Sequence, residues 1–351
     1  MKAPSINRRS FLNTSLFAGL GLAMRPWQAN ARPAMGAVGE RTRVALTTGT
    51  DRANMAFEGM KPFADAIRRA IAGKRVVIKP NNVAIDTPLC ATHAESIEGI
   101  LEFLKSIGRT DNIVIAESAA GGPTLDGFAN YGYNPVAGKF GAKLVDLDQE
   151  AYEKIHVFDE KDFRPHPVRT SSLLLSRDNF IISATRLKTH DRAVATLSLK
   201  NIVFGAPIKD LGFAWGRNRK PGTTIDKPIV HGSGFRGINY NLYALSRQLR
   251  PDLSVLDGVE GMEGNGPVGG TPVDHRVGVV SLDWLAADRV GVELMGIDFA
   301  KMGYLNFCAD AGMGCADLAR MEILGPEIRD HVKPYRLHRN IEEQLIWMRP
   351  A

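Results

Sequence analysis

The stretch Val76-Val77-Ile78-Lys79-Pro80-Asn81-Asn82 decides the fold, because an apolar run passes directly into a polar turn. A helix is predicted next, since Thr92 and Glu95 fit a capping box and Gly108 fits a helix stop. Another apolar run, residues 113–115, follows the helix. This order is typical of a βαβ unit, in which a crossover helix joins two parallel strands. The predicted helix carries apolar residues at helical spacing, namely Ile97, Ile100, Leu101, Leu104 and Ile107.

The same alternation of short β-branched runs and helical segments continues from residue 43. It predicts an α/β fold with a mainly parallel sheet flanked by helices. The glycine-rich and basic stretch between Gly205 and Gly237 is predicted to be a long irregular excursion, and loops of that length are usually functional or disordered. We expect one α/β domain over residues 43–325 and a loosely packed C-terminal arm over 326–351. Further strands are predicted at residues 143–145, 180–183, 253–256 and 277–282, and further helices at 239–249 and at 284–294 after the cap Asp283.

The first residues resemble a targeting segment. Asn7-Arg8-Arg9-Ser10-Phe11-Leu12 precedes a short apolar run, and Ala29-Asn30-Ala31 offers a cleavage site of small residues. Paired arginines before Phe11 are typical of the twin-arginine signal of bacteria, whereas the alternative is a cytoplasmic protein with a chance basic start. The apolar run is too short for a stable membrane span. Residues 1–31 are therefore predicted to be a signal peptide that directs a soluble protein through the twin-arginine translocation machinery to the periplasm.

The charge of the chain is mostly explained by that segment. Four of the 44 basic residues and none of the 38 acidic residues precede Arg32, which leaves 40 basic against 38 acidic residues, a net charge of +2. No nucleic-acid partner is expected from so small an excess.

The three cysteines are Cys90, Cys308 and Cys315. They are too few and too widely spaced for the ligand motifs of an iron–sulfur cluster, so such a cluster is not expected. Cys308 and Cys315 could pair in an oxidising compartment. The favoured alternative is that both are small buried apolar residues.

Functional side chains follow four of the predicted strands. Because the carboxyl ends of parallel strands meet at one edge of a sheet, we expect these side chains to converge there, although each could simply solvate a turn or cap a helix. The glycines of residues 257–267 would allow the backbone to approach a ligand while three carboxylates stay free; the alternative is a hairpin with solvated acids. The strand-end residues are Lys79, Asn81 and Asn82, then Glu117, then Lys188 and His190, then Asp257, Glu260 and Glu263.

Roles can be assigned from side-chain chemistry. His93, at the first turn of a helix, is expected to be neutral, because the helix dipole disfavours a cation there. Histidine and buried lysine are common acids and bases, lysines and backbone N–H groups bind anions, and carboxylates with imidazoles bind divalent cations. The predicted catalytic residues are His93, Lys188 and His190; the predicted substrate-binding residues are Lys79, Asn81, Asn82, Lys200, Asn201, Gly264 and Gly266; the predicted metal ligands are Glu117, His231, Asp257, Glu260 and Glu263.

Several of these motifs together resemble the domain-of-unknown-function family 362, an uncharacterised family associated with iron–sulfur proteins. The resemblance runs from about residue 76 to residue 325 and implies no assigned reaction. Members often carry an attached cysteine-rich ferredoxin segment, which this sequence does not show, so electron transfer is not expected here. A further family-like motif, Asp283 to Asp288, has Trp284 in place of a proline. The motifs that carry the resemblance are Lys79-Pro80-Asn81, Thr92-His93, Glu117-Ser118, Lys188-Thr189-His190, Thr196, Leu199-Lys200-Asn201, Gly205, Asp257-Gly258, Met262-Glu263-Gly264, Gly266-Pro267 and Gly270.

Two functions are compatible with these residues. The first is a metal- or cofactor-assisted enzyme, an isomerase, lyase or hydrolase, that acts on an anionic small molecule held by Lys79, Lys188 and Lys200. The second is a non-catalytic periplasmic ligand-binding or accessory protein. The mixture of histidines, lysines and carboxylates favours the enzyme, because an anion receptor needs no acids nearby.

Overall fold

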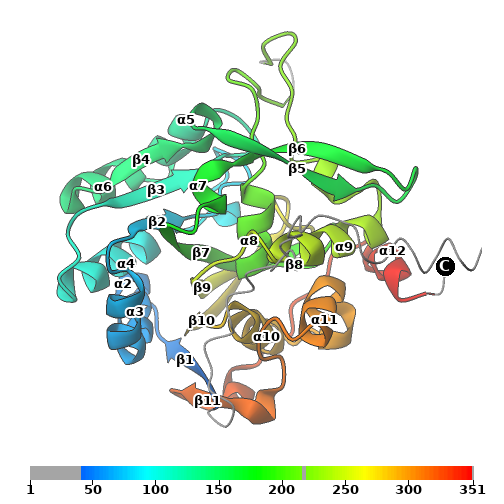
Figure 1. Cartoon of the computed structure of the whole chain (residues 1–351). Helices are drawn as coiled ribbons and strands as arrows, with labels where there is room; N and C mark the ends of the chain where they lie inside the picture. The colour runs from blue at the N-terminus through cyan, green and yellow to red at the C-terminus, as the bar shows by residue number, and fades with distance from the viewer. Residues whose placement is uncertain (1–40, 216–218, 350–351) are drawn as a thin grey trace, which may run out of the picture. The chain divides into compact units, whose positions relative to one another are not determined.

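The computed structural model describes residues 41–215 and 219–349, which form one α/β unit (Figure 1). The predicted signal peptide, residues 1–31, lies outside the described residues. The strands are β1 (Thr42–Thr48), β2 (Arg75–Lys79), β3 (Ile113–Glu117), β4 (Lys143–Asp146), β5 (Tyr152–Phe158), β6 (Pro165–Ser171), β7 (Asn179–His190), β8 (Val194–Thr196), β9 (Leu253–Glu263), β10 (Thr271–Ser281) and β11 (Met321–Leu324).

The main sheet has the strand order β11-β1-β10-β9-β7-β2-β3-β4, and β8 pairs with β7 off this path. Strands β9, β7, β2, β3 and β4 are parallel neighbours, whereas β10 is antiparallel to both β1 and β9. The prediction of a mainly parallel α/β sheet is therefore confirmed. Strands β5 and β6 form a separate antiparallel hairpin.

Side chains of the central strands alternate between two apolar cores. In β2, Val76 and Ile78 face one core and Val77 faces the other, because successive residues of a strand point to opposite sides of a sheet. Helices α2, α3, α4 and α6 cover the first core, and α8, α9, α10 and α11 cover the second (Figure 1). The helices are α2 (Arg52–Met60), α3 (Ala64–Ala70), α4 (Ala94–Ser106), α5 (Thr124–Asn130), α6 (Tyr133–Phe140), α7 (Ser172–Leu175), α8 (Ser198–Gly205), α9 (Phe235–Ser246), α10 (Trp284–Leu294), α11 (Gly303–Asp310) and α12 (Ile341–Gln344).

Helix caps agree with the sequence at one helix and differ at another. Helix α10 has the predicted bounds, and the Asp283 carboxylate accepts hydrogen bonds from the N–H groups of Leu285 and Ala286. The N-cap of α4 is His93, not Thr92. Thr92 is buried, and its hydroxyl instead donates to the Ala184 carbonyl, so it fastens the loop after β2 to β7.

Three predicted strands, β7, β9 and β10, are several residues longer than expected, which changes the setting of several candidate residues. Strand β7 continues to His190, so Lys188 and His190 lie within it rather than in a following loop. Strand β9 continues to Glu263 and turns into β10. The segment predicted as an open glycine loop with free carboxylates is therefore an extended hairpin. The alternative considered above was a hairpin with solvated acids, whereas the three acids here pair with arginines.

The described part of the predicted excursion between α8 and α9 has little regular structure but is held to the rest of the fold by ion pairs. The buried ammonium of Lys209 binds Asp148, which lies just after β4. Arg169 of β6 binds Asp226 at 2.8 Å. In Figure 1 the excursion rises beside the β5–β6 hairpin at the top of the view. These contacts bring residues 226–231 back onto the carboxyl edge of the sheet.

The C-terminal arm packs more closely than predicted. Gln344 is buried; its amide donates to the His190 carbonyl, and its oxygen accepts from the Val194 N–H. Both bonds brace the turn between β7 and β8. Gln344 is polar and belongs to no apolar pattern, so its burial could not be predicted from the sequence.

All three cysteines are buried free thiols, as favoured above for Cys308 and Cys315. Across residues 41–215 and 219–349, the longest apolar helical stretches fall short of what a bilayer crossing needs.

Candidate functional site

A cavity of about 220 Å³ lies at the carboxyl edge of β2, β3 and β7. This edge is where the ligands of parallel α/β sheets usually bind. Its walls also include α8 and the returning end of the excursion. The lining residues are Lys79, Asn81, Asn82, Val83, Glu117, Ser118, Ala120, His190, Asp191, Thr196, Lys200, Phe204, Gly205, Lys227, His231 and Pro267. We call five of its charged and imidazole residues, Lys79, Glu117, His190, Lys200 and Lys227, the cavity cluster.

Lys79 and Glu117 form a buried ion pair at the base of the cavity. The Lys79 Nζ is 2.8 Å from each carboxylate oxygen and 2.8 Å from the Pro80 carbonyl. The carboxylate also accepts the backbone N–H groups of Asn82 and Ser118. Burial lowers the pKa of Lys79, and the charge of Glu117 opposes that shift. Both partners are thus fully satisfied by the protein.

Helix α8 carries Lys200 and Asn201 into the site. Its first N–H groups, those of Ser198 and Leu199, donate to the carboxylate of Asp288 at 2.8 and 3.0 Å. Burial raises the pKa of Asp288 to about 7. Asp283 and Asp288 of the family-like motif thus cap two different helices, α10 and α8.

Glycine at position 205 leaves room for the buried lysine. A Cβ there would lie 1.8 Å from Lys79 Cε, an impossible contact. The Asn201 oxygen accepts from Lys79 Nζ at 3.1 Å and from Asn81 Nδ2 at 3.0 Å. Lys79, Asn81 and Asn201 are therefore brought together as the sequence predicted.

Lys200 meets His190 inside the cavity. The Lys200 Nζ is 2.9 Å from His190 Nε2 and 4.5 Å from the centre of the Phe204 ring. Burial, followed by the charge of Lys188, lowers the pKa of Lys200 to about 7. Burial and the charge of Lys200 hold the pKa of His190 well below its usual range. Near neutral pH Lys200 can therefore gain or lose a proton beside an imidazole that stays neutral.

Lys227 and His231 come from the excursion. The Lys227 ammonium donates to three carbonyls, of Phe204, Gly205 and Pro207, at 2.7 to 3.2 Å. Burial lowers the pKa of Lys227 to about 7. The His231 ring packs edge-on to Phe204, and burial lowers its pKa to about 3. His231 is therefore neutral.

Three polar atoms of the lining are buried without a hydrogen-bond partner among the described residues. They are Asn81 Oδ1, Asn82 Nδ2 and Thr196 Oγ1. Buried polar atoms are nearly always satisfied, so a set of them around one cavity indicates a site that a ligand or ordered water completes. The set offers an acceptor, a donor and a hydroxyl.

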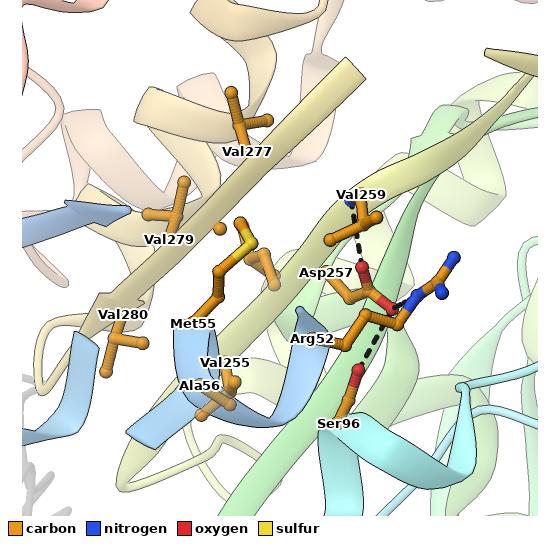
Figure 2. A pocket seen from close by; sticks show the side chains of 12 residues that line it. Arg52, Met55, Ala56, Ser96, Val255, Asp257, Val259, Val277, Val279 and Val280 are labelled. Carbon is orange, nitrogen blue, oxygen red and sulfur yellow. Dashed lines mark hydrogen bonds and ion pairs between the residues drawn. The ribbon is translucent and has the colours of Figure 1, made fainter. Parts of the chain in front are cut away.

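A second polar group lies elsewhere, between α2, α4 and β9, and we call its members Arg52, His93, Ser96 and Asp257 the Arg52 cluster. Figure 2 shows Arg52, Ser96 and Asp257 pointing toward one another. Asp257 accepts from Ser96 Oγ at 2.9 Å and is 3.3 Å from Arg52 Nε. The space beside them is only about 10 Å³. Burial and Arg52 lower the pKa of His93, so it is neutral as predicted, but it does not line the cavity.

The remaining candidates are also placed outside the cavity. Lys188 is buried and donates to the Cys90 carbonyl at 2.5 Å. Glu260 pairs with Arg186, and Glu263 pairs with Arg336. Gly264 has φ +74° beside Arg336, and Gly266 packs against the Thr189 carbonyl, where a Cβ would lie 2.1 Å from the oxygen. The two glycines shape the β9–β10 turn.

The five predicted metal ligands are not brought together. Glu117 is bound by Lys79, His231 lies across the cavity, and the other three carboxylates pair with arginines. Among the described residues, we find no group of three or more His, Cys, Asp or Glu side chains placed to hold a metal ion. The lysine-rich lining does not fit a hard divalent cation, which prefers several oxygen ligands.

Sequence reasoning missed Lys227 and gave Thr196 no role. Lys227 lies within the excursion, four residues before His231. Because irregular segments of that length are usually functional or disordered, the length of the excursion was the available sign that its residues contribute to a site. Thr196 was part of a family-like motif only. Asp191, 3.1 Å from His190 Nδ1, was also missed.

Comparisons with known proteins give a family but no activity. A thylakoid-associated protein of Synechocystis sp. is 25% identical over 232 residues, 66% of this chain and 65% of that protein. The chain thus spans slightly less than two thirds of that relative. No solved structure matches this chain. The family model described as "Domain of unknown function (DUF362)" matches residues 76–293, more than half of the sequence. The chain therefore belongs to the DUF362 family.

Proposed function

We propose that this protein is an enzyme that binds a small anionic molecule in the cavity and transfers a proton at one of its carbon atoms. The observation that carries the proposal is a buried amine–imidazole pair surrounded by polar atoms without partners. Catalytic pairs need pKa values near the working pH, and functional sites are where burial shifts them most.

An anion suits the charges of the lining. Three lysines, Lys79, Lys200 and Lys227, face it, and the acids are Glu117 and the half-exposed Asp191. In a buried site the field of a lysine is screened far less than in water. The ammonium groups of Lys79 and Lys227 already donate to protein oxygens, so they contribute mainly through their charge.

Proton transfer suits the pair of Lys200 and His190. A neutral imidazole removes a proton, and the neighbouring ammonium stabilises the negative charge that develops. Isomerisations and eliminations both begin with this step, so we favour these two classes over hydrolysis. Lys200 and His190 are the proposed catalytic residues, and Asn81, Asn82 and Thr196 are proposed to position the substrate.

Binding is tested by calorimetric titration of the purified protein with oxalate, pyruvate and inorganic phosphate. We expect at least one anion to bind, and Lys200→Met to weaken its affinity about tenfold or more, a typical loss for a buried charge-assisted contact. Lys139→Met is the matched control, because that lysine is exposed and paired with Glu98. Absence of binding by all three anions would contradict the proposal.

Catalysis is tested by exchange of the methyl protons of pyruvate in D₂O, followed by NMR. The wild type is expected to accelerate exchange, and His190→Gln is expected to bind pyruvate but lose the acceleration. Binding without exchange in the wild type would instead support the non-catalytic ligand-binding function.

We also propose export to the periplasm by the twin-arginine machinery, on the basis of Arg8 and Arg9 before Phe11. Replacing both arginines by lysine is expected to leave the protein in the cytoplasm. Cell fractionation with an antibody measures this, and an unchanged periplasmic fraction would contradict the proposal.

A further inference from the structure

Lys200 differs from the other lysines of the cavity in its hydrogen bonds. Lys79 Nζ contacts four oxygen atoms and Lys227 Nζ contacts three. Lys200 Nζ has His190 Nε2 as its one hydrogen-bond partner among the described residues. The other hydrogen-bonding positions of Lys200 Nζ have no partner among the described residues, although Lys200 is only 5% exposed.

The surroundings of Lys200 favour the uncharged amine. No carboxylate of the described chain forms an ion pair with it, and Phe204 covers one side. The charged and titratable groups near it are His190, Lys188, Asp191 and His231, of which Lys188 opposes protonation and Asp191 favours it. A desolvated lysine beside another cation is the usual form of an amine nucleophile.

We propose that Lys200 forms an imine with the carbonyl group of a small oxo acid, a molecule that carries a ketone or aldehyde next to a carboxylate. This inference rests on the proposed function and names its substrate class. The volume of about 220 Å³ suits a molecule of a few carbon atoms, since it is below the usual range for drug-sized ligands. Asn82 Nδ2 and Thr196 Oγ1 provide unused donors for the carboxylate.

The step balances without an oxidant, a reductant or a cofactor. The lone pair of Lys200 Nζ forms a bond to the carbonyl carbon, and the π electrons of the C=O bond move to oxygen. His190 Nε2, 2.9 Å away, relays one proton from the new C–N nitrogen to that oxygen, which becomes a hydroxyl. The second proton of the nitrogen passes to the hydroxyl by the same route, and the hydroxyl leaves as water when the C=N bond forms. The products are one imine and one water, and the imine makes the adjacent carbon more acidic.

Reductive trapping tests the inference on the full-length protein. The wild type is treated with glyoxylate and sodium cyanoborohydride, digested, and mapped by mass spectrometry. We expect the carboxymethyl adduct on Lys200 to form at least about tenfold faster than on Lys139, because the neutral fraction of an amine with a pKa near 7 exceeds that of an ordinary lysine. Acetaldehyde, which lacks the carboxylate, should lose this preference, and oxalate should block it.

Lys200→Arg keeps the positive charge but cannot form the imine under these conditions. It is expected to bind oxalate and to give no adduct at position 200. Labelling of Lys227 in preference to Lys200, or equal labelling of all lysines, would overturn the inference. Oxalate binding without an adduct would overturn the imine alone, whereas loss of both would also overturn the proposed function. The wild-type map decides the question even if the variant does not fold.

Discussion

The cavity cluster and the Arg52 cluster are built from the same kinds of residue but are satisfied to different degrees. In the Arg52 cluster, Asp257 is met by Arg52, by Ser96 Oγ and by the Val259 N–H, and about 10 Å³ of space is left. In the cavity cluster, Lys200 has a single hydrogen-bond partner within residues 41–215 and 219–349, three nearby polar atoms have none there, and about 220 Å³ is open.

This contrast in hydrogen-bond satisfaction separates the polar groups that stabilise the fold from those that are available to a ligand. A buried group with all its partners rigidifies the structure, whereas an incompletely satisfied group is costly to keep and is retained where it has another use. Perturbed pKa values occur in both clusters, so they do not distinguish them. The number of buried polar atoms without a hydrogen-bond partner among the described residues does: three line the cavity, against one, Arg52 Nε, in the Arg52 cluster, and that nitrogen still lies 3.3 Å from Asp257 Oδ2.

The largest effect is expected for Glu117→Gln, which leaves the ammonium of Lys79 buried without its counter-charge. Removing one partner of a buried ion pair typically costs about 3 to 5 kcal/mol. Urea denaturation measures the loss. Glu58→Gln, at an exposed pair with Lys61, is the control and should change stability by less than about 0.5 kcal/mol. Equal effects at the two positions would contradict the stabilising role of the Lys79–Glu117 pair.

Asp257→Asn is expected to lower the free energy of unfolding by about 1 to 3 kcal/mol, because Arg52 keeps some solvent contact. It should not change oxalate affinity in calorimetric titration. Glu260→Gln, whose side chain is 46% exposed, is the matched control for stability. Weakened oxalate binding by Asp257→Asn would mean that the two clusters act together.

The pH dependence of stability is expected to reflect the buried lysines of the cavity. Burial lowers the pKa of Lys200 and Lys227 to about 7, so between pH 7 and about 10 the folded protein binds fewer protons than the unfolded chain. The free energy of unfolding should therefore rise with pH in this window. Lys200→Met should reduce the slope by up to about 1.4 kcal/mol per pH unit. Denaturation at pH 7, 8 and 9 measures it, and an unchanged slope would show that Lys200 is not desolvated.

The smallest effect is expected for Thr196→Val. Because the buried hydroxyl has no hydrogen-bond partner in the described part of the chain, its loss should leave stability unchanged or raise it by about 1 kcal/mol, while oxalate affinity falls. Thr92→Val is the matched control: that hydroxyl donates to Ala184 and accepts from Asn81, so stability should fall by about 1 to 3 kcal/mol. Destabilisation by Thr196→Val would place Thr196 with the structural groups.

The sequence predicted the fold well because its signals are local. The continuous apolar runs of β2 and β3 and the helical spacing in α4 need no tertiary information. The cap of α10 at Asp283 can likewise be predicted from residues next to it in the sequence. The hairpin of β9 and β10 was harder, since dense glycine suggests an open loop as readily as a strand.

The candidate site was predicted in part, because strand order decides which strand ends meet. Lys79, Glu117 and His190 follow or end neighbouring strands and do line one cavity. Asp257 belongs to the next strand, but its side chain meets α2 and α4 instead. Lys227 depended on the path of the excursion, which is fixed by distant pairs such as Lys209 with Asp148.

That fastening of the excursion has a consequence for how the site comes into being. The cavity is lined by residues that are more than a hundred positions apart in the sequence. It therefore forms only after the sheet has assembled and the excursion has packed onto it. A ligand that recognises it binds only the completed protein and should raise the free energy of unfolding of the whole unit with the logarithm of the ligand concentration above Kd. A ligand bound in the cavity would then indicate that the chain has folded completely.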